Sequence, residues 1–264
     1  MIGAIAGDII GSVHEANPIK TTDFPLFTEY SRFTDDTVLT IATAYALMND
    51  LDYATAYRQF GRAYPCAGYG GTFIFWLKAD EAPPYNSWGN GSAMRISPIG
   101  LTLGSMQNVL REAEKSAAVT HNHPEGIKGA QATALAVFMG RQGKSKDDIR
   151  RAISDKFDYN LDRSIDEIRP GYFFNISCQG SVPEAIIAFL QSDDVESAIR
   201  LAVSLGGDSD TQACIAGAIA HAFYRKFPQE IEKEVRSRLP REFLNILDEF
   251  LNKYMPDRDL RPKA

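Results

Sequence analysis

The segment Gly206-Gly207-Asp208-Ser209-Asp210-Thr211 is the most informative stretch of this sequence, because it runs directly into the apolar stretch 212–223, QACIAGAIAHAF. A second acidic cluster, Thr34-Asp35-Asp36-Thr37, lies far away in the chain and also precedes a long apolar stretch. Four carboxylates brought together repel one another, so a fold holds them only by protonating some or by binding cations between them. The pair of clusters is therefore the main sequence clue to function.

A site of this composition favours hard divalent cations. Carboxylate and hydroxyl oxygens without histidine or cysteine suit Mg²⁺ or Mn²⁺ better than zinc. The presence of two similar clusters predicts two ions that share ligands. The candidate metal ligands are Thr34, Asp35, Asp36, Asp208, Asp210 and Thr211.

Helix capping is the alternative explanation for each cluster. Asp, Ser and Thr are favoured at helix N-termini, because they accept hydrogen bonds from free backbone N–H groups and complement the helix dipole. One cluster alone would be interpreted as a cap. Two clusters of the same composition, the second introduced by Gly206 and Gly207, favour a binuclear site, since glycine lets backbone and ligand approach closely.

Helical spacing dominates the chain, and alternating strand patterns are almost absent. Apolar residues recur at three and four residues after both clusters, as in Val38, Ile41 and Tyr45. Further helices are predicted over residues 53–63, 106–118, 126–141, 146–156, 182–191, 194–205, 229–237 and 241–253. Pro183 is expected in the first turn of its helix, where a missing N–H costs little. The sequence predicts an all-α fold, an orthogonal helical bundle with the metal site at helix N-termini.

Length and composition predict one domain spanning residues 1–264. With 44% hydrophobic residues the chain can bury a sizeable core, and no linker-like stretch divides it. The net charge is −6, and Lys and Arg are scattered, so no nucleic-acid partner is expected. No apolar run reaches the roughly 18 residues of a membrane span, and Asp8 comes too early for a signal peptide. We expect a cytoplasmic protein without a membrane partner.

Residues 64–100 are rich in Gly and Pro and are predicted to form loops. They contain the sequence 86–95, NSWGNGSAMR, whose backbone N–H groups can bind an anion. Ser87 and Ser92 add hydroxyl groups, and Trp88 can stack on a base or sugar. A plain surface loop is the alternative.

The cysteines and histidines give weaker signals. Cys66, Cys178 and Cys214 are widely spaced among apolar or small residues, so we interpret them as core thiols rather than as disulfides or zinc ligands. His121 and His123 have no further His or Cys in register for zinc. By itself His121 is interpreted as a cap or a hydrogen-bonded core residue.

Five motifs, in this order and spacing, resemble the ADP-ribosylglycohydrolase family, which includes the dinitrogenase-reductase-activating glycohydrolase. The resemblance covers residues 3 to about 225 and is carried by 3–15 (GAIAGDIIGSVHE), 33–37 (FTDDT), 89–95 (GNGSAMR), 120–121 (TH) and 206–211 (GGDSDT). It implies a compact all-α protein that holds two Mg²⁺ or Mn²⁺ ions. It also implies cleavage of the bond between the anomeric carbon of ADP-ribose and an acceptor.

The resemblance also implies roles for particular residues. The two acidic clusters match the family's two metal-binding motifs, and Glu15 matches a glutamate that acts as a base or mobile metal ligand. Asp36 is a second acid–base candidate, although metal ligation competes with that role. Ser87, Trp88, Gly89, Asn90 and Gly91, with Ser92 beside them, match the loop that cradles the diphosphate, and His121 matches a ribose-side histidine.

The sequence therefore predicts a metal-dependent hydrolase acting on an ADP-ribosylated protein or on a small ADP-ribose conjugate. The acceptor stays open among arginine, serine, O-acetyl groups and nucleobases. Two alternatives remain: a non-catalytic module that binds ADP-ribose or a related nucleotide, and a structural helical protein whose acids only cap helices.

Overall fold

The computed structural model describes residues 1–255, and within them it confirms the predicted all-α fold. The helices are α1 (Ile2–Gly11), α2 (Asp35–Asn49), α3 (Tyr53–Ala63), α4 (Gly71–Lys78), α5 (Gly91–Met94), α6 (Ser97–Thr102), α7 (Met106–Ala118), α8 (Pro124–Arg141), α9 (Lys146–Phe157), α10 (Ile165–Ile168), η1 (Arg169–Gly171), α11 (Cys178–Leu190), α12 (Val195–Val203), α13 (Ser209–Tyr224), α14 (Gln229–Ser237) and α15 (Arg241–Tyr254). Across residues 1–255 there is no strand, and the single β-bridge joins Gly89 to Ser177. None of these helices is long and apolar enough to cross a membrane.

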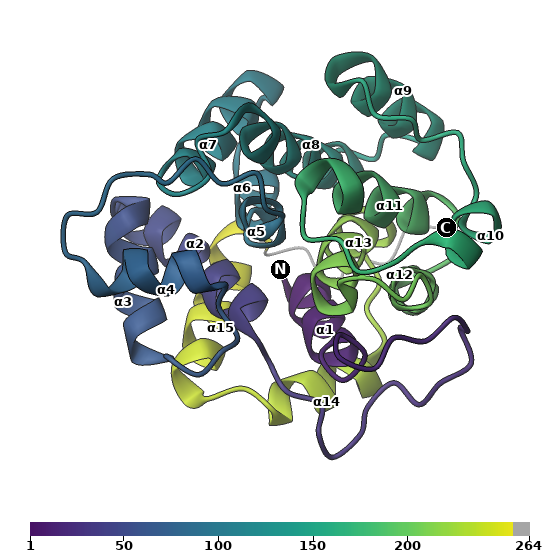
Figure 1. Ribbon diagram of the computed structural model, residues 1–264, viewed down its shortest axis with the longest axis horizontal. Coiled ribbons are helices and arrows are strands. Elements are labelled where there is room, and N and C mark those ends of the chain that lie inside the picture. The colour runs from purple at the N-terminus through teal and green to yellow at the C-terminus, as the bar shows by residue number, and fades with distance from the viewer. Residues whose placement is uncertain (256–264) are drawn as a thin grey trace.

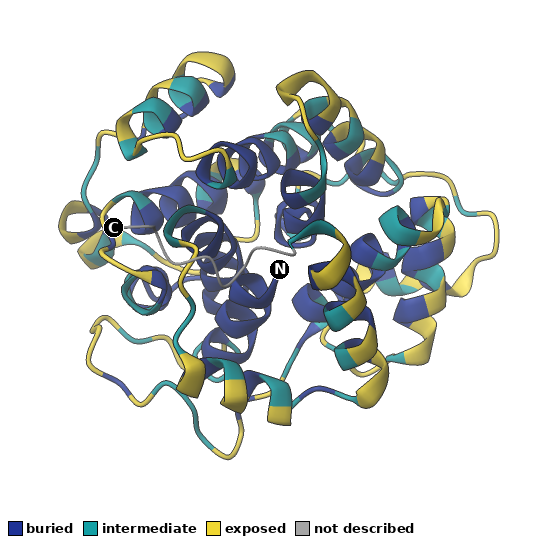
Figure 2. Cartoon of the chain, turned by 180° about the vertical axis from the view of Figure 1, so that it is seen from behind, coloured by how far each residue is buried: buried dark blue, intermediate teal, exposed yellow. Residues whose placement is uncertain are grey.

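Helices α1 and α13 form the centre of the molecule and lie side by side in Figure 1. Every residue of α1 is buried, and so is α13 from Ser209 to Ala222. Figure 2 shows the same arrangement by burial, with dark blue central helices and yellow on the solvent side of the outer ones. A helix that is buried on all sides must contact its neighbours through small residues if the backbones are to come close.

Glycines spaced four residues apart on α1 provide that close contact. An added β-carbon at Gly7 would lie 2.0 Å from the carbonyl oxygen of Ala213, and one at Gly3 would lie 2.3 Å from that of Gly217. At Gly11 it would lie 2.5 Å from the carbonyl oxygen of Ser209. The two backbones therefore touch along most of α1, and the contact brings Asp8 of α1 near the acidic N-terminus of α13.

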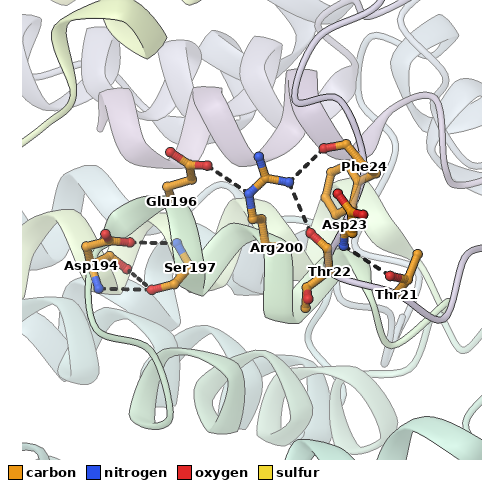
Figure 3. Close-up of polar contacts among 8 residues, drawn as sticks. All are labelled: Thr21, Thr22, Asp23, Phe24, Asp194, Glu196, Ser197 and Arg200. Carbon is orange, nitrogen blue, oxygen red and sulfur yellow. Dashed lines mark hydrogen bonds and ion pairs between the residues drawn. The ribbon is translucent and has the colours of Figure 1, made fainter.

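The segment between α1 and α2, residues 12–34, contains no helix and is tied to α12 by polar contacts (Figure 3). The Nη1 of Arg200 donates to the carbonyl oxygens of Thr22 and Phe24, at 3.1 and 2.7 Å. Its Nε donates to Glu196 at 2.8 Å. Lys20 adds hydrogen bonds from its Nζ to the carbonyl oxygens of Tyr172 and Leu205. These contacts fix the second half of the segment 12–34, and Glu15 lies in its first half.

Three sequence predictions need correction. The helix placed at residues 182–191 begins at Cys178, so Pro183 lies inside α11 and not in its first turn. The Ser177 side chain accepts a hydrogen bond from Gly180 N, and burial of Val182 and Ile186 outweighs the one backbone bond that proline removes.

Residues 64–100 are not all loop, because they contain α4, α5 and α6. Their Gly and Pro content hid short helices that tertiary packing stabilises, with Phe73 and Trp76 of α4 buried. Cys66 is exposed, so the prediction of a core thiol was wrong for this residue, whereas Cys178 and Cys214 are buried. All three cysteines are free thiols.

We predict that Gly7→Ala lowers the free energy of unfolding by about 3 kcal/mol, because the new methyl group meets rigid backbone atoms of α13. Urea denaturation measures the change. Gly104→Ala is the matched control, since nothing lies within 4 Å of its added β-carbon, and it should change stability by less than about 0.5 kcal/mol. Equal stability of the two variants would contradict the close packing of α1 and α13.

Candidate active site

Both acidic clusters open into one cavity of about 690 Å³. Of the residues singled out from sequence, the lining includes Glu15, Thr34, Asp35, Asp36, Ser87, Trp88, Gly89, Asn90, Gly91, His121, Asp208, Asp210 and Thr211. The acids come from the N-termini of α2 and α13, and the Ser87–Gly91 loop leads into α5. Segments up to about 200 residues apart in the chain thus meet in one place, and Ser92 is the one candidate that does not line the cavity.

The carboxylates form two triads that share one residue. Oxygens of Asp8, Asp36 and Asp210 lie within 4.8 Å of one another, and so do oxygens of Glu15, Asp208 and Asp210. Such spacing allows each triad to contact one cation, with Asp210 belonging to both. Asp35 belongs to neither triad, although it lines the same cavity.

Hydroxyl groups join the two clusters. The Thr211 Oγ1 donates to Asp36 Oδ2 at 3.3 Å, which links α13 to α2. Thr34 caps α2 by accepting a hydrogen bond from the backbone N of Asp36 at 3.3 Å. Asp35, Asp36 and Asp210 lie in the first turns of α2 and α13, where the helix dipoles favour negative charge. Capping and cation binding are compatible here, because the cap of α2 is the Thr34 hydroxyl and Asp208, the N-cap of α13, makes no side-chain cap hydrogen bond.

Asp8 is the site residue that sequence reasoning missed. It is fully buried in α1, and its oxygens accept hydrogen bonds from Thr34 N (2.9 Å), Thr34 Oγ1 (2.7 Å), Thr37 N (3.1 Å) and Thr37 Oγ1. These four donors hold the first turn of α2 against α1. The available signal was an aspartate in the middle of an otherwise apolar buried stretch, IGAIAGDIIG.

Burial makes the ionised cluster unfavourable without cations. It raises the pKa of Asp35 to about 8, with further contributions from the charges of Asp8 and Asp208. Burial also raises the pKa of Asp8 to about 6, although the hydrogen bonds from Thr34 and Thr37 oppose the shift. For Asp36 and Asp210, burial and then the neighbouring carboxylates raise the pKa well above its ordinary value.

One buried oxygen of this cluster lacks a partner. Asp36 Oδ1 has no hydrogen-bond donor among the described residues, whereas Oδ2 accepts from Thr211. A buried carboxylate oxygen without a donor is costly, and a cation would satisfy it. All candidate metal ligands in this cluster are oxygen atoms, so the cluster fits Mg²⁺ or Mn²⁺.

Glu15 lies at the cavity wall on the segment that follows α1. Partial burial raises the pKa of its carboxyl group, with added repulsion from Asp208 and Asp8 and an opposing effect of Arg32. The residue is exposed, unlike the other acids of its triad. A carboxylate with a raised pKa that solvent can reach is suited to exchanging protons with water.

The glycine-containing loop is held by α11 and by the segment before it. Asn90 N donates to the carbonyl oxygen of Ile176 at 2.8 Å, and Cys178 N donates to that of Trp88 at 2.9 Å. The Asn90 Nδ2 donates to Asp208 Oδ2 at 2.7 Å and to Ser181 Oγ at 3.2 Å. The side chain of Asn90 thus connects the loop to the second acidic cluster.

The other loop residues differ in their roles. Ser87 Oγ accepts from Gly89 N at 3.1 Å and stabilises the turn. The Ser92 Oγ is buried behind the loop and donates to the carbonyl oxygen of Gly126 at 2.7 Å. Trp88 lines the cavity and is 53% exposed, and its ring makes an edge contact with His123, with the ring centres 6.0 Å apart.

His121 and His123, which lie two residues apart, have different roles. His123 caps α8, since its Nδ1 accepts from the backbone N of Glu125 at 3.1 Å. His121 is buried, lines the cavity, and places its Nδ1 at 2.8 Å from the Thr120 Oγ1. The hydrogen-bonded core role expected for His121 therefore coexists with access to the cavity.

The fold and this cavity define a class of all-α proteins. In this class, buried carboxylates at two helix N-termini and a glycine-containing loop line one cavity. A sequence profile of the ADP-ribosylglycohydrolase family matches residues 1–259. The chain belongs to the ADP-ribosylglycohydrolase family.

Relatives and a solved structure agree with this assignment. The chain is 28% identical to the mouse and human proteins named ADP-ribosylhydrolase ARH3, over 85% of the chain and 82% or 84% of those proteins. It is 26% identical to ADP-ribosylarginine hydrolase Tri1 of Pseudomonas putida (strain GB-1), over 85% of the chain and 69% of that protein. A structure titled "ADP-ribosylglycohydrolase-related protein complex" matches with a TM-score of 0.72 at 23% identity, covers 96% of each chain, and shows the same fold.

The raised pKa values predict how the metal-free protein responds to pH. The folded state keeps protons on Asp8 and Asp35 that the unfolded chain loses above its ordinary pKa of 3.8. Stability therefore falls as the pH rises from about 4 to about 8. We expect the melting temperature of chelator-treated protein to be roughly 5 °C lower near pH 8 than near pH 5.5.

Divalent cations should reverse this trend, because they replace the protons on the carboxylates. Added Mn²⁺ should raise the melting temperature more near pH 8 than near pH 5.5. Asp35→Asn is the control and should flatten the pH dependence of the metal-free protein. A melting temperature that rises with pH in the absence of metal would contradict the raised pKa values of Asp8 and Asp35.

Proposed function

We propose that this chain is a metal-dependent hydrolase that cleaves the glycosidic bond between ADP-ribose and an acceptor. The observation that carries the proposal is the pair of carboxylate triads that share Asp210 and line one cavity together with the Ser87–Gly91 loop. Membership of the ADP-ribosylglycohydrolase family and the names of the relatives support it. Because the cavity takes residues from Glu15 to Thr211, we also propose that the described residues, 1–255, form a single domain; the end of the predicted domain, residues 256–264, lies outside the described residues.

The proposed cofactors are two Mg²⁺ or Mn²⁺ ions. Asp36, Asp208 and Asp210 would hold them, with Thr34, Asp35 and Thr211 contributing hydroxyl or carboxylate oxygens from the same cavity. When bound, such a pair grips sugar hydroxyls and lowers the pKa of a water molecule. Asp8 belongs to one triad, but four hydrogen bonds already occupy its oxygens, so its proposed role is to orient the first turn of α2.

Glu15 is the proposed catalytic base. Breaking a glycosidic bond develops positive charge at the anomeric carbon, and a nearby carboxylate can take a proton from the water that attacks it. The water oxygen bonds to the anomeric carbon, the bond to the acceptor breaks, and the acceptor leaves with the bonding electrons and takes up one proton, which balances the proton that Glu15 takes from the water and later releases. The raised pKa of Glu15 makes its carboxylate a stronger base for the proton of that water. Asp36 is the second acid–base candidate and competes with its own role as a ligand.

The cavity wall formed by the Ser87–Gly91 loop is the proposed site for the diphosphate. Gly89, Asn90 and Gly91 present backbone with no bulky side chain in front of His121. An added β-carbon at Gly91 would lie 3.2 Å from His121 Nε2, so a larger residue would crowd the histidine. Ser87 supports this turn, Ser92 anchors it from behind, and Trp88 offers a ring at the rim. Positioning of the substrate between this wall and the acids would supply much of the acceleration.

The proposed partners are ADP-ribosylated proteins or small ADP-ribose conjugates. The name of one relative, ADP-ribosylarginine hydrolase, makes ADP-ribosyl arginine the first substrate to test. Serine-linked, nucleobase-linked and O-acetyl conjugates complete the set. If the purified protein with Mn²⁺ or Mg²⁺ released no ADP-ribose from any of them, the proposal of an enzyme would fail. Tight ADP-ribose binding without turnover would instead favour the non-catalytic module.

Asp208→Ala should reduce ADP-ribose release by at least about 100-fold, because it removes a carboxylate from one triad and the partner of Asn90. The helical circular dichroism spectrum should stay unchanged. Asp155→Asn, which removes an exposed carboxylate on α9, is the matched control and should keep full activity. A fully active Asp208→Ala variant would exclude these carboxylates from the mechanism.

A further inference from the structure

Arg95 is a fully buried cation without a carboxylate partner. Its side chain is 0% exposed, and no ion pair to it is formed by residues 1–255. The Nη2 donates to the carbonyl oxygen of Ser116 at 3.1 Å and to Thr120 Oγ1 at 2.9 Å. Within the described part of the chain, Nε and Nη1 have no acceptor. The guanidinium carbon lies 4.3 Å from the centre of the Tyr57 ring, which offsets part of the cost.

Burial of an arginine side chain without a carboxylate partner costs free energy, so its contacts indicate its role. Packing alone would be served at lower cost by an apolar side chain of similar volume. Among the described residues, Thr120 is the one side chain to which Arg95 donates a hydrogen bond, and Thr120 in turn contacts His121 in the cavity. Arg95, Thr120 and His121 thus form a chain of hydrogen bonds that ends at the proposed ligand site.

The direction of these hydrogen bonds follows from the chemistry of the three groups. A guanidinium only donates, so Thr120 Oγ1 must accept from Arg95. Two groups hydrogen-bond to the rest of this hydroxyl: His121 Nδ1 at 2.8 Å and the phenol of Tyr85. Because that phenol keeps its own proton and can donate it to the second lone pair of Oγ1, the Thr120 proton remains for His121 Nδ1. Donation to Nδ1 leaves that nitrogen without a proton, and the proton of a neutral imidazole then resides on Nε2.

The remaining ring nitrogen faces the glycine-containing loop. Added β-carbons at Gly89 and Gly91 would lie 3.5 and 3.2 Å from His121 Nε2. Burial, and then the charge of Arg95, holds the pKa of His121 well below its ordinary value, so the ring is neutral. The ring of Tyr85, whose centre lies 5.9 Å away, also faces it, and burial raises the pKa of that phenol to about 12.

We propose that Arg95 is a positioning residue which, through Thr120, fixes His121 as a neutral imidazole with its proton on Nε2, directed at the Gly89–Gly91 loop. This proposal rests on the proposed function, because the group that receives the Nε2 proton is an oxygen of an anionic ligand such as a phosphate. The opposite tautomer would direct a lone pair at that oxygen and repel it. Arg95 lines the same cavity, and in this proposal it acts on the ligand through His121 as a positioning residue.

The first test is the protonation pattern of His121 in ligand-free and metal-free full-length protein. Two-bond ¹⁵N–¹H correlation spectra of histidine-labelled protein distinguish the tautomers, and comparison with His121→Gln assigns the signals. The wild type should show Nε2 protonated and Nδ1 bare from about pH 8 to about pH 5.5. A wild-type spectrum with the proton on Nδ1, or with both nitrogens protonated in this range, would overturn the proposal.

The second test separates positioning from packing at Thr120. Thr120→Val keeps the shape but removes the hydroxyl, and its spectrum should show a mixture of tautomers. Thr120→Ser restores the hydroxyl and should return the single wild-type pattern. A Val variant with the wild-type pattern would overturn the proposal, and if that variant fails to fold, the wild-type and Ser spectra decide.

Binding of ADP-ribose in the presence of Mn²⁺ gives an independent readout by calorimetry. Thr120→Val should bind about 10-fold more weakly, whereas Thr120→Ser should stay within about 2-fold of the wild type. The spectra do not depend on hydrolysis. The predicted tautomer in a protein without hydrolase activity would refute the proposed function alone, and the wrong tautomer in an active enzyme would refute this inference alone.

Discussion

The direct contact between the backbones of α1 and α13 is the constraint on which the rest of the site depends. It exists because Gly3, Gly7 and Gly11 carry no β-carbon where α13 passes. The contact places Asp8 beside the N-terminus of α13, and Asp8 in turn holds the first turn of α2 through Thr34 and Thr37. This one helix–helix contact thus brings two acidic clusters, distant in sequence, to a single cavity.

Bringing the acids together has an electrostatic cost that the protein reduces in several ways. Hydrogen bonds satisfy Asp8, the dipoles of α2 and α13 favour negative charge, and Asn90 donates to Asp208. These interactions leave Asp36 Oδ1 without a donor and leave the pKa of Asp210 well above its ordinary value. Bound dications would remove this remaining electrostatic cost. Their binding would explain why a stable fold tolerates such a cluster. The buried cation Arg95 also lines the cavity and donates to Thr120, next to His121, so the cavity contains a buried positive charge as well as the acids.

Much of this arrangement could be predicted from sequence. The acidic clusters, most helices and the glycine-containing loop have local signatures: capping residues, apolar residues at helical spacing, and glycines in series. Asp8 has only a weak signature, an acid within an apolar stretch, and Arg95 has no signature of its role, because the importance of both comes from burial and from partners far along the chain. The same reason explains the errors at Pro183 and at residues 64–100, where tertiary packing overrides local propensity. Ser92 illustrates a subtler limit, since the motif identifies the loop but not which side of it each hydroxyl faces.

The most direct test of the central claim is an anomalous diffraction map from crystals of the protein soaked in Mn²⁺. We predict two manganese peaks in the cavity, one contacting Asp36, one contacting Asp208, and both contacting Asp210. A map without manganese at these carboxylates, from protein whose two acidic clusters still share the cavity, would contradict the binuclear site.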